Sequence, residues 1–81
     1  MMEDYLDRIE VDVRKLGGKP VIKGTRIPVS LIVKLVARGM RPEEIVKEYP
    51  ELTPDDVKAA LTYAAKLLEK EVILPDRVRI I

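Results

Sequence analysis

The run GKPVIKGTRIPV at residues 18–29 constrains the fold of this chain more than any other segment. Two glycines and two prolines punctuate it, around a short apolar pair and a compact polar tip. Glycine readily adopts positive φ angles, and proline excludes the residue before it from the helical region. The segment is therefore predicted to be a tight turn or hairpin that presents Lys23, Thr25 and Arg26. A purely structural connector is an equally open interpretation.

Charge is distributed unevenly along a chain whose net charge is only +1. Residues 19–41 carry six basic side chains and no acidic one, whereas residues 42–56 carry six acidic side chains and a single lysine. Such asymmetry indicates a charged partner, or self-association through complementary patches. The six basic residues are Lys19, Lys23, Arg26, Lys34, Arg38 and Arg41.

The composition argues against an enzyme. The chain has no His and no Cys, and Ser30 is its only serine. Histidine is the commonest metal ligand and a frequent general base, so its absence argues against both a metal site and an acid–base catalytic site. The adjacent acid pairs at 43–44 and 55–56 diverge by about 100° on a helix and cannot converge on one metal ion. We therefore expect no catalytic residue, no metal site and no cofactor.

Length and hydropathy predict one small domain that covers residues 1–81. With 47% hydrophobic residues and only three aromatic ones, its core must be aliphatic. No apolar run approaches the length of a membrane span, so we expect a soluble, cytoplasmic protein. Asn and Gln are absent and 36% of residues are charged, a composition typical of thermophiles.

Residues 8–29 are predicted to form a strand and a hairpin. Ile9, Val11 and Val13 alternate with charged residues, and a period of two is typical of a half-buried strand. Ser30 then resembles the N-cap of a first helix that ends at Gly39. This helix is apolar almost all round, so it either lies at the centre of the core or also serves an oligomer interface.

Two further helices are predicted over residues 42–71. Pro42 fits the first position of the second helix, and Pro50 ends it. Thr53 and Asp56 have the spacing of a capping box at the start of a third helix, which runs to about Glu71. The predicted fold is mainly α with a small N-terminal β element: a three-helix, helix-turn-helix-like domain with a tail at 72–81.

Several of these segments together closely resemble a prokaryotic family catalogued as domain of unknown function number 433 and described as antitoxin-like. The resemblance covers roughly residues 9–68. It implies a helix-turn-helix fold and the role of antitoxin, with a PIN-like ribonuclease toxin as partner. Arg41 stands where the family usually has Ser or Thr, which predicts a looser start to the second helix. The matching segments are residues 18–29, Gly39, Pro42-Glu43-Glu44-Ile45, Tyr49-Pro50, Leu52-Thr53 and Asp56-Val57.

Operator DNA is the second partner that the resemblance implies. A helix-turn-helix reads bases with the start of its second helix, but Asp55 and Asp56 stand there and oppose phosphate binding. The basic segment is a better surface, although Arg26 has an alternative role in an internal ion pair with the second helix. The predicted DNA-binding residues are Lys19, Lys23, Thr25, Arg26, Lys34, Arg38 and Lys58.

The tail at 72–81 is too apolar for a free solvated segment. Its residues Val78, Ile80 and Ile81 are predicted to bind a partner, or to pair with residues 9–13 of this chain or of a second subunit. We expect a homodimer, because large apolar patches seldom remain exposed on monomers. The alternative to an antitoxin-like regulator is a small dimeric interaction module that binds no nucleic acid.

Overall fold

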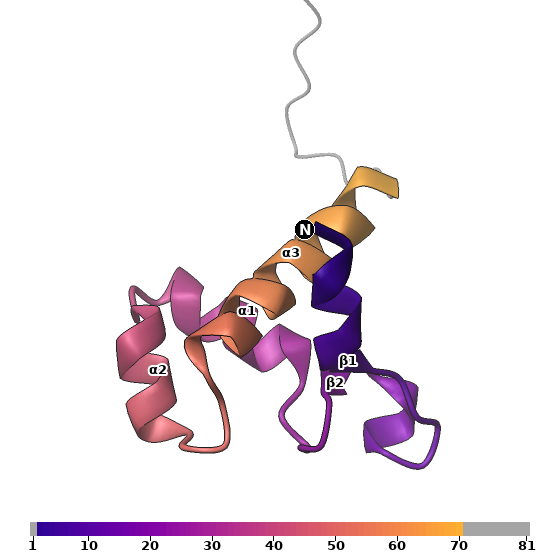
Figure 1. Ribbon diagram of the computed structural model, residues 1–81, viewed down its shortest axis with the longest axis horizontal. Coiled ribbons are helices and arrows are strands. Elements are labelled where there is room, and N and C mark those ends of the chain that lie inside the picture. The colour runs from indigo at the N-terminus through magenta and orange to yellow at the C-terminus, as the bar shows by residue number, and fades with distance from the viewer. Residues whose placement is uncertain (1, 71–81) are drawn as a thin grey trace, which may run out of the picture.

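The computed structural model describes residues 2–70, with side chains from residue 5 onward, so the predicted tail and its residues Val78, Ile80 and Ile81 lie outside the described residues. Helix α3 is the longest element and contacts α1, α2 and the first 3-10 helix (Figure 1). The prediction of a mainly helical domain with a small N-terminal β element is confirmed. The elements in chain order are the 3-10 helix η1 (Met2–Arg8), β1 (Ile9–Glu10), the 3-10 helix η2 (Leu16–Gly18), β2 (Val21–Ile22), α1 (Val29–Ala37), α2 (Pro42–Glu48) and α3 (Pro54–Lys70).

The small sheet folds the opening run back on itself. Strand β1 pairs antiparallel with β2, with Ile9 opposite Ile22 and Glu10 opposite Val21. On its other side β2 meets the end of the same run, where Val21 forms a bridge with Pro28. Strand β2 is therefore central, and the predicted hairpin stands directly before α1.

The predicted strand over residues 9–13 is shorter than its alternation suggested, since β1 ends at Glu10. The reason is local: the Asp12 carboxylate accepts the Arg14 N–H at 2.8 Å, and the Asp12 carbonyl accepts the Lys15 N–H at 2.8 Å. Such side-chain bonds offer the backbone a turn in place of a ladder. Sequence patterns also did not predict η1, which contacts α3.

Helix α1 begins one residue before the predicted cap. Pro28 flanks the helix in an extended conformation, and Ser30 lies inside its first turn. The Val29 N–H donates to the Pro20 carbonyl at 3.0 Å, which fixes the entry of the chain without a side-chain cap. The predicted stop at Gly39 is confirmed, because this residue has φ +97.

The start of α2 is not loose. Arg41 lacks a capping hydroxyl, but the Glu44 carboxylate accepts the Arg41 backbone N–H at 2.8 Å. This is the reciprocal half of a capping box, in which an acid at the third helical position reaches back to the cap residue. Glu44 therefore supplies the stabilisation that the residue at position 41 does not.

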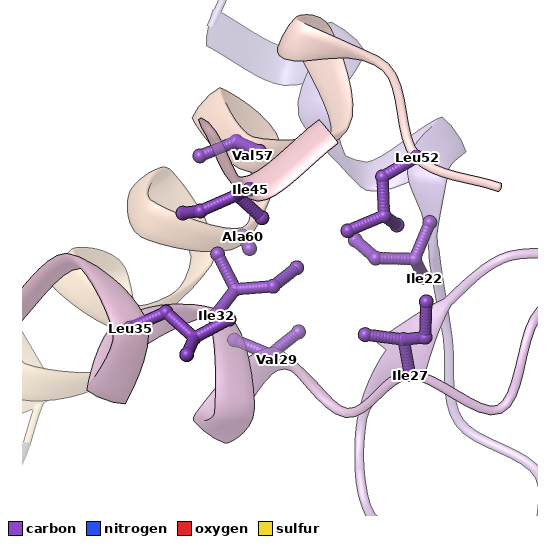
Figure 2. Packing of buried hydrophobic residues seen from close by; sticks show 9 residues of the cluster. All are labelled: Ile22, Ile27, Val29, Ile32, Leu35, Ile45, Leu52, Val57 and Ala60. Carbon is purple, nitrogen blue, oxygen red and sulfur yellow. The ribbon is translucent and has the colours of Figure 1, made fainter. Parts of the chain in front are cut away.

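The core is aliphatic and draws on every α-helix of the domain (Figure 2). Ile32 of α1, Ile45 of α2 and Val57 of α3 are fully buried, and Ile22 of β2 is nearly so. Burying such a side chain stabilises the fold by about 1.5–3 kcal/mol. The apolar residues on the flanks of α1 are half-buried and pack against this cluster, so α1 is central to the core.

Candidate nucleic-acid interface

The turn between β2 and α1 is built by its own backbone and one hydroxyl. The Thr25 N–H donates to the Ile22 carbonyl at 3.0 Å, and Gly24 has φ +80. A type II turn requires a positive φ at its third residue, which explains the glycine. A Cβ at Gly24 would meet nothing within 4 Å, so the need is conformational and not one of space.

Thr25, a predicted DNA-binding residue, holds this turn together. Its hydroxyl donates to the Ile22 carbonyl at 2.7 Å and accepts the Ile27 N–H at 3.0 Å. The hydroxyl therefore both donates and accepts inside the turn. The cations on either side of it, Lys23 and Arg26, are exposed to solvent and have no such role.

The same turn is tied to the N-terminal elements. The Lys23 N–H donates to the Arg8 carbonyl at 2.8 Å, directly beside the β1–β2 pairing. Since Val29 is held by Pro20 at the other end of the run, both ends of the turn are fixed to the body of the domain. A rigid support positions exposed side chains more precisely than a free loop does.

The predicted basic segment is exposed and forms no ion pair with the other residues of the range 5–70. All six of its cations are exposed, and among residues 5–70 none has a carboxylate within ion-pair distance. The alternative role of Arg26, an ion pair with the second helix, is thus not observed among these residues. Within the range 5–70, the cations that do pair belong to other segments: Arg8, Arg14, Lys15 and Lys66.

Helix α1 carries two further cations of this segment. Lys34 and Arg38 are one helical turn apart and both are exposed, whereas Ile32 and Leu35 enter the core. Arg38 is also the C-cap residue, where a cation favourably meets the negative end of the helix dipole. We call five of the exposed cations of this segment, Lys19, Lys23, Arg26, Lys34 and Arg38, the basic surface.

The start of α3 uses one of its two adjacent acids, Asp56, inside the fold. Asp56 is only 7% exposed, and its Oδ2 accepts the Thr53 N–H at 2.9 Å. In return the Thr53 hydroxyl accepts the Asp56 N–H at 3.2 Å, so the predicted capping box is confirmed. Of the two acids, only Asp55 presents its carboxylate to solvent.

Arg8 completes this helix start, and sequence reasoning missed it. Its Nη1 donates to Asp56 Oδ1 at 3.1 Å, and its Nη2 lies 3.6 Å from Asp55 Oδ2. Arg8 and Asp56 are 48 positions apart in the chain, so no local pattern could link them.

Lys58 lies on α3, outside the segment that carries the basic surface. It lines a groove along α3 together with Leu61, Thr62 and Lys66, and the residue of α2 at its rim is Pro42. No residue of α1 or of the turn contributes to this groove. Five of the predicted DNA-binding residues are therefore exposed along residues 19–38, Thr25 has a turn-forming role, and Lys58 lies on α3.

Two other classes of site are not found within the described residues. No helix there is long and apolar enough to cross a bilayer. That part of the chain also holds no group of three or more side chains of the metal-ligating types.

Comparisons with known proteins give the same fold and no activity. A stretch of 49 residues is 39% identical to the uncharacterized protein y4eO of Sinorhizobium fredii, covering 60% of this chain and 22% of that protein. Another of 30 residues is 53% identical to an uncharacterized protein of Archaeoglobus fulgidus, covering 37% of this chain and 83% of that one. This chain thus spans little of the Sinorhizobium protein's length.

A solved structure supports the architecture directly. The crystal structure of a DUF433 member protein from Anabaena variabilis superposes with a TM-score of 0.72 at 30% identity, covering 84% of this chain and 71% of that one. The sequence profile of the family described as protein of unknown function (DUF433) matches residues 9–64, which hold β1, the basic surface and all of the core. The chain therefore belongs to the DUF433 family.

Proposed function

We propose that the protein is an antitoxin-like regulator that binds operator DNA through the basic surface. The observation that carries the proposal is a set of exposed cations, without ion-pair partners among residues 5–70, on a rigid turn and the helix that follows it. Surface lysines are often merely solvated, but acids are present elsewhere in the chain and none of those described here pairs with these cations. A surface of one sign favours a polyanion.

Arg26 is the strongest single contact in this interface. Its guanidinium offers a planar set of five donors that suits phosphate oxygens or the edge of a guanine. It is exposed next to Thr25, whose hydroxyl fixes the turn, so the backbone that carries Arg26 is already ordered before DNA binds. Lys23, Lys34 and Arg38 then supply phosphate contacts of lower geometric specificity.

The toxin partner of the proposal is a PIN-like ribonuclease. Its support is the resemblance of residues 18–29 and of the helical segments to an antitoxin-like family. The partner-binding residues proposed for it, Val78, Ile80 and Ile81, lie outside the described residues. Co-expression of the chain with the product of an adjacent gene, followed by co-purification of the pair, tests this part.

A second candidate function is a dimeric interaction module without nucleic-acid binding. One observation favours it: the segment after β1 exposes three aliphatic side chains, Val11, Val13 and Leu16, of which Val13 is 83% exposed. Aliphatic side chains gathered on one exposed segment are typical of protein contact sites. Sedimentation equilibrium with and without the promoter duplex distinguishes the two cases, because this module requires a dimer that Val13→Asp disrupts and forms no complex with the duplex.

The DNA proposal is tested by reversing two cations of the turn. A Lys23→Glu, Arg26→Glu variant is expected to bind a duplex from the chain's own promoter far more weakly. The slope of log K against log salt should also become shallower, by about 0.9 for each phosphate that the variant no longer neutralises. The matched control is Lys47→Glu, Lys70→Glu, which changes the net charge equally but lies on α2 and at the end of α3. Equal losses of affinity in both variants, or no salt-sensitive affinity in the unmodified protein, would overturn the proposal.

A further inference from the structure

Arg8 contacts two parts of the domain that are distant in the sequence. Its backbone carbonyl accepts the Lys23 N–H of the basic turn at 2.8 Å. Its guanidinium donates to Asp56 at 3.1 Å and lies 3.6 Å from Asp55, at the start of α3. One residue of η1 therefore joins the basic surface to the helix-turn-helix.

The connection extends further through Asp56. While Oδ1 of this carboxylate accepts Arg8, Oδ2 accepts the Thr53 N–H at 2.9 Å. A path of hydrogen bonds thus runs from Lys23 through Arg8 and Asp56 to Thr53. Because Asp56 is buried, removing its cationic partner would leave a poorly compensated charge.

Arg8 also sets the charge at the start of α3. Without it, the exposed carboxylate of Asp55 and the buried one of Asp56 would leave two uncompensated negative charges where a helix-turn-helix meets phosphate. The guanidinium compensates Asp56 inside the fold and lies beside the exposed carboxylate of Asp55. Its side chain is itself 42% exposed, so this compensation reaches the surface.

We infer that Arg8 is a positioning residue of the proposed DNA interface, which spans both the basic turn and the start of α3. The inference rests on the proposed function. Arg8 fixes the turn relative to the helix-turn-helix and offsets the carboxylates there, so that one duplex can lie across both. Arg8 is the last residue of η1 and lies one residue before the range 9–64 that matches the family profile. The contact between the turn and α3 is therefore made by a residue outside that range.

The test compares Arg8→Ala, Arg8→Lys and Arg8→Ala combined with Asp55→Asn. Affinity for the promoter duplex is measured with its salt dependence, at a temperature where circular dichroism shows each variant folded. The control is Arg14→Ala, which removes an ion pair with Asp12 on an exposed loop outside α3.

Arg8→Ala is expected to weaken binding about fivefold, the factor for one uncompensated charge close to a phosphate in water. The salt slope should change by less than the roughly 0.9 expected for one lost phosphate contact, because Arg8 itself contacts no phosphate. Arg8→Lys should retain most of the affinity. Adding Asp55→Asn should restore much of what Arg8→Ala loses, which a merely structural role of Arg8 would not allow.

Two results separate failure of the inference from failure of the proposed function. If the unmodified protein binds the duplex and folded Arg8→Ala binds equally well, or if Asp55→Asn restores nothing, the role of Arg8 is refuted while DNA binding stands. If the unmodified protein binds no duplex at any salt concentration, the DNA proposal fails and the inference falls with it.

Discussion

The starts of α1 and α3 use their polar residues in opposite ways. At α3, Thr53 and Asp56 bond each other, and Arg8 donates to the other carboxylate oxygen of Asp56. At α1, no side chain caps the helix, and the preceding turn relies on its backbone and on Thr25 alone. The cations around that turn are left with no role in the fold of the described residues.

The difference follows from the length of the side chains. A hydroxyl or a short carboxylate reaches backbone groups two or three residues away, so Thr25, Thr53 and Asp56 stabilise local structure. Lysine and arginine carry their charges further from the backbone and remain available to a partner unless an acid lies close by. Mutations of the polar residues at the start of α3 should therefore lower stability, whereas mutations of the cations around the turn before α1 should weaken binding.

The largest effect on stability is expected at Asp56. Asp56→Ala removes the helix cap and the partner of Arg8, and should lower the free energy of unfolding by about 1–3 kcal/mol. The matched control is Asp55→Ala, an exposed acid whose loss should cost less than about 0.5 kcal/mol. Urea denaturation of both variants measures the difference, and equal values would break the contrast between the two acids.

The second-largest loss of stability is expected for Thr25→Val. The substitution keeps the shape but leaves the Ile27 N–H without its acceptor, which should cost about 1–2 kcal/mol. Thr62→Val is the control, since that hydroxyl donates to the Lys58 carbonyl on an exposed helix face and should matter little. If Thr25→Val left the free energy of unfolding unchanged, the backbone alone would hold the turn. The Thr25 hydroxyl of the unmodified protein would then be available to contact DNA.

Arg26→Ala and Lys34→Ala should leave stability within about 0.5 kcal/mol of the unmodified protein. Neither cation has an internal partner among residues 5–70, so only binding should suffer. Thermal and urea unfolding provide the measurement. A destabilisation well above this range would reveal a structural contact for the basic surface and weaken the case for a free interface.

The smallest effect concerns the loop between β1 and η2. The hydrogen bond from Lys15 to Glu10, with the charge of that lysine, holds the Glu10 pKa below its ordinary value. A lowered folded-state pKa adds stability above the unfolded-state pKa, and this is lost as the pH falls through the folded-state pKa. The loop should therefore loosen only in acid. The chemical shift of the Glu10 carboxyl in a pH titration measures its pKa, and Lys15→Met should raise that pKa towards its ordinary value.

Much of the fold was predictable because its signals are local. Pro42 and Gly39 mark helix ends through their own backbone conformations and the Thr53–Asp56 pair through hydrogen bonds three residues apart, and the structure confirms all three. The strand after Ile9 was predicted too long, because alternation alone does not show that Asp12 bonds the backbone of Arg14. The basic surface was predictable as a segment, but its lack of internal partners among residues 5–70 was not.

What the sequence by itself determined is the helix ends at Gly39, Pro42 and the Thr53–Asp56 pair, and the apolar faces of the helices, since each depends on neighbours within about one helical turn. It also determined that the cations of the basic surface belong to one segment of the chain. Tertiary structure alone decided which charges are compensated: Arg8 meets Asp56 across 48 positions, while Arg26 meets no carboxylate of residues 5–70. The physical reason is that electrostatic interactions depend on distance in space, which only the packing of η1 against α3 establishes.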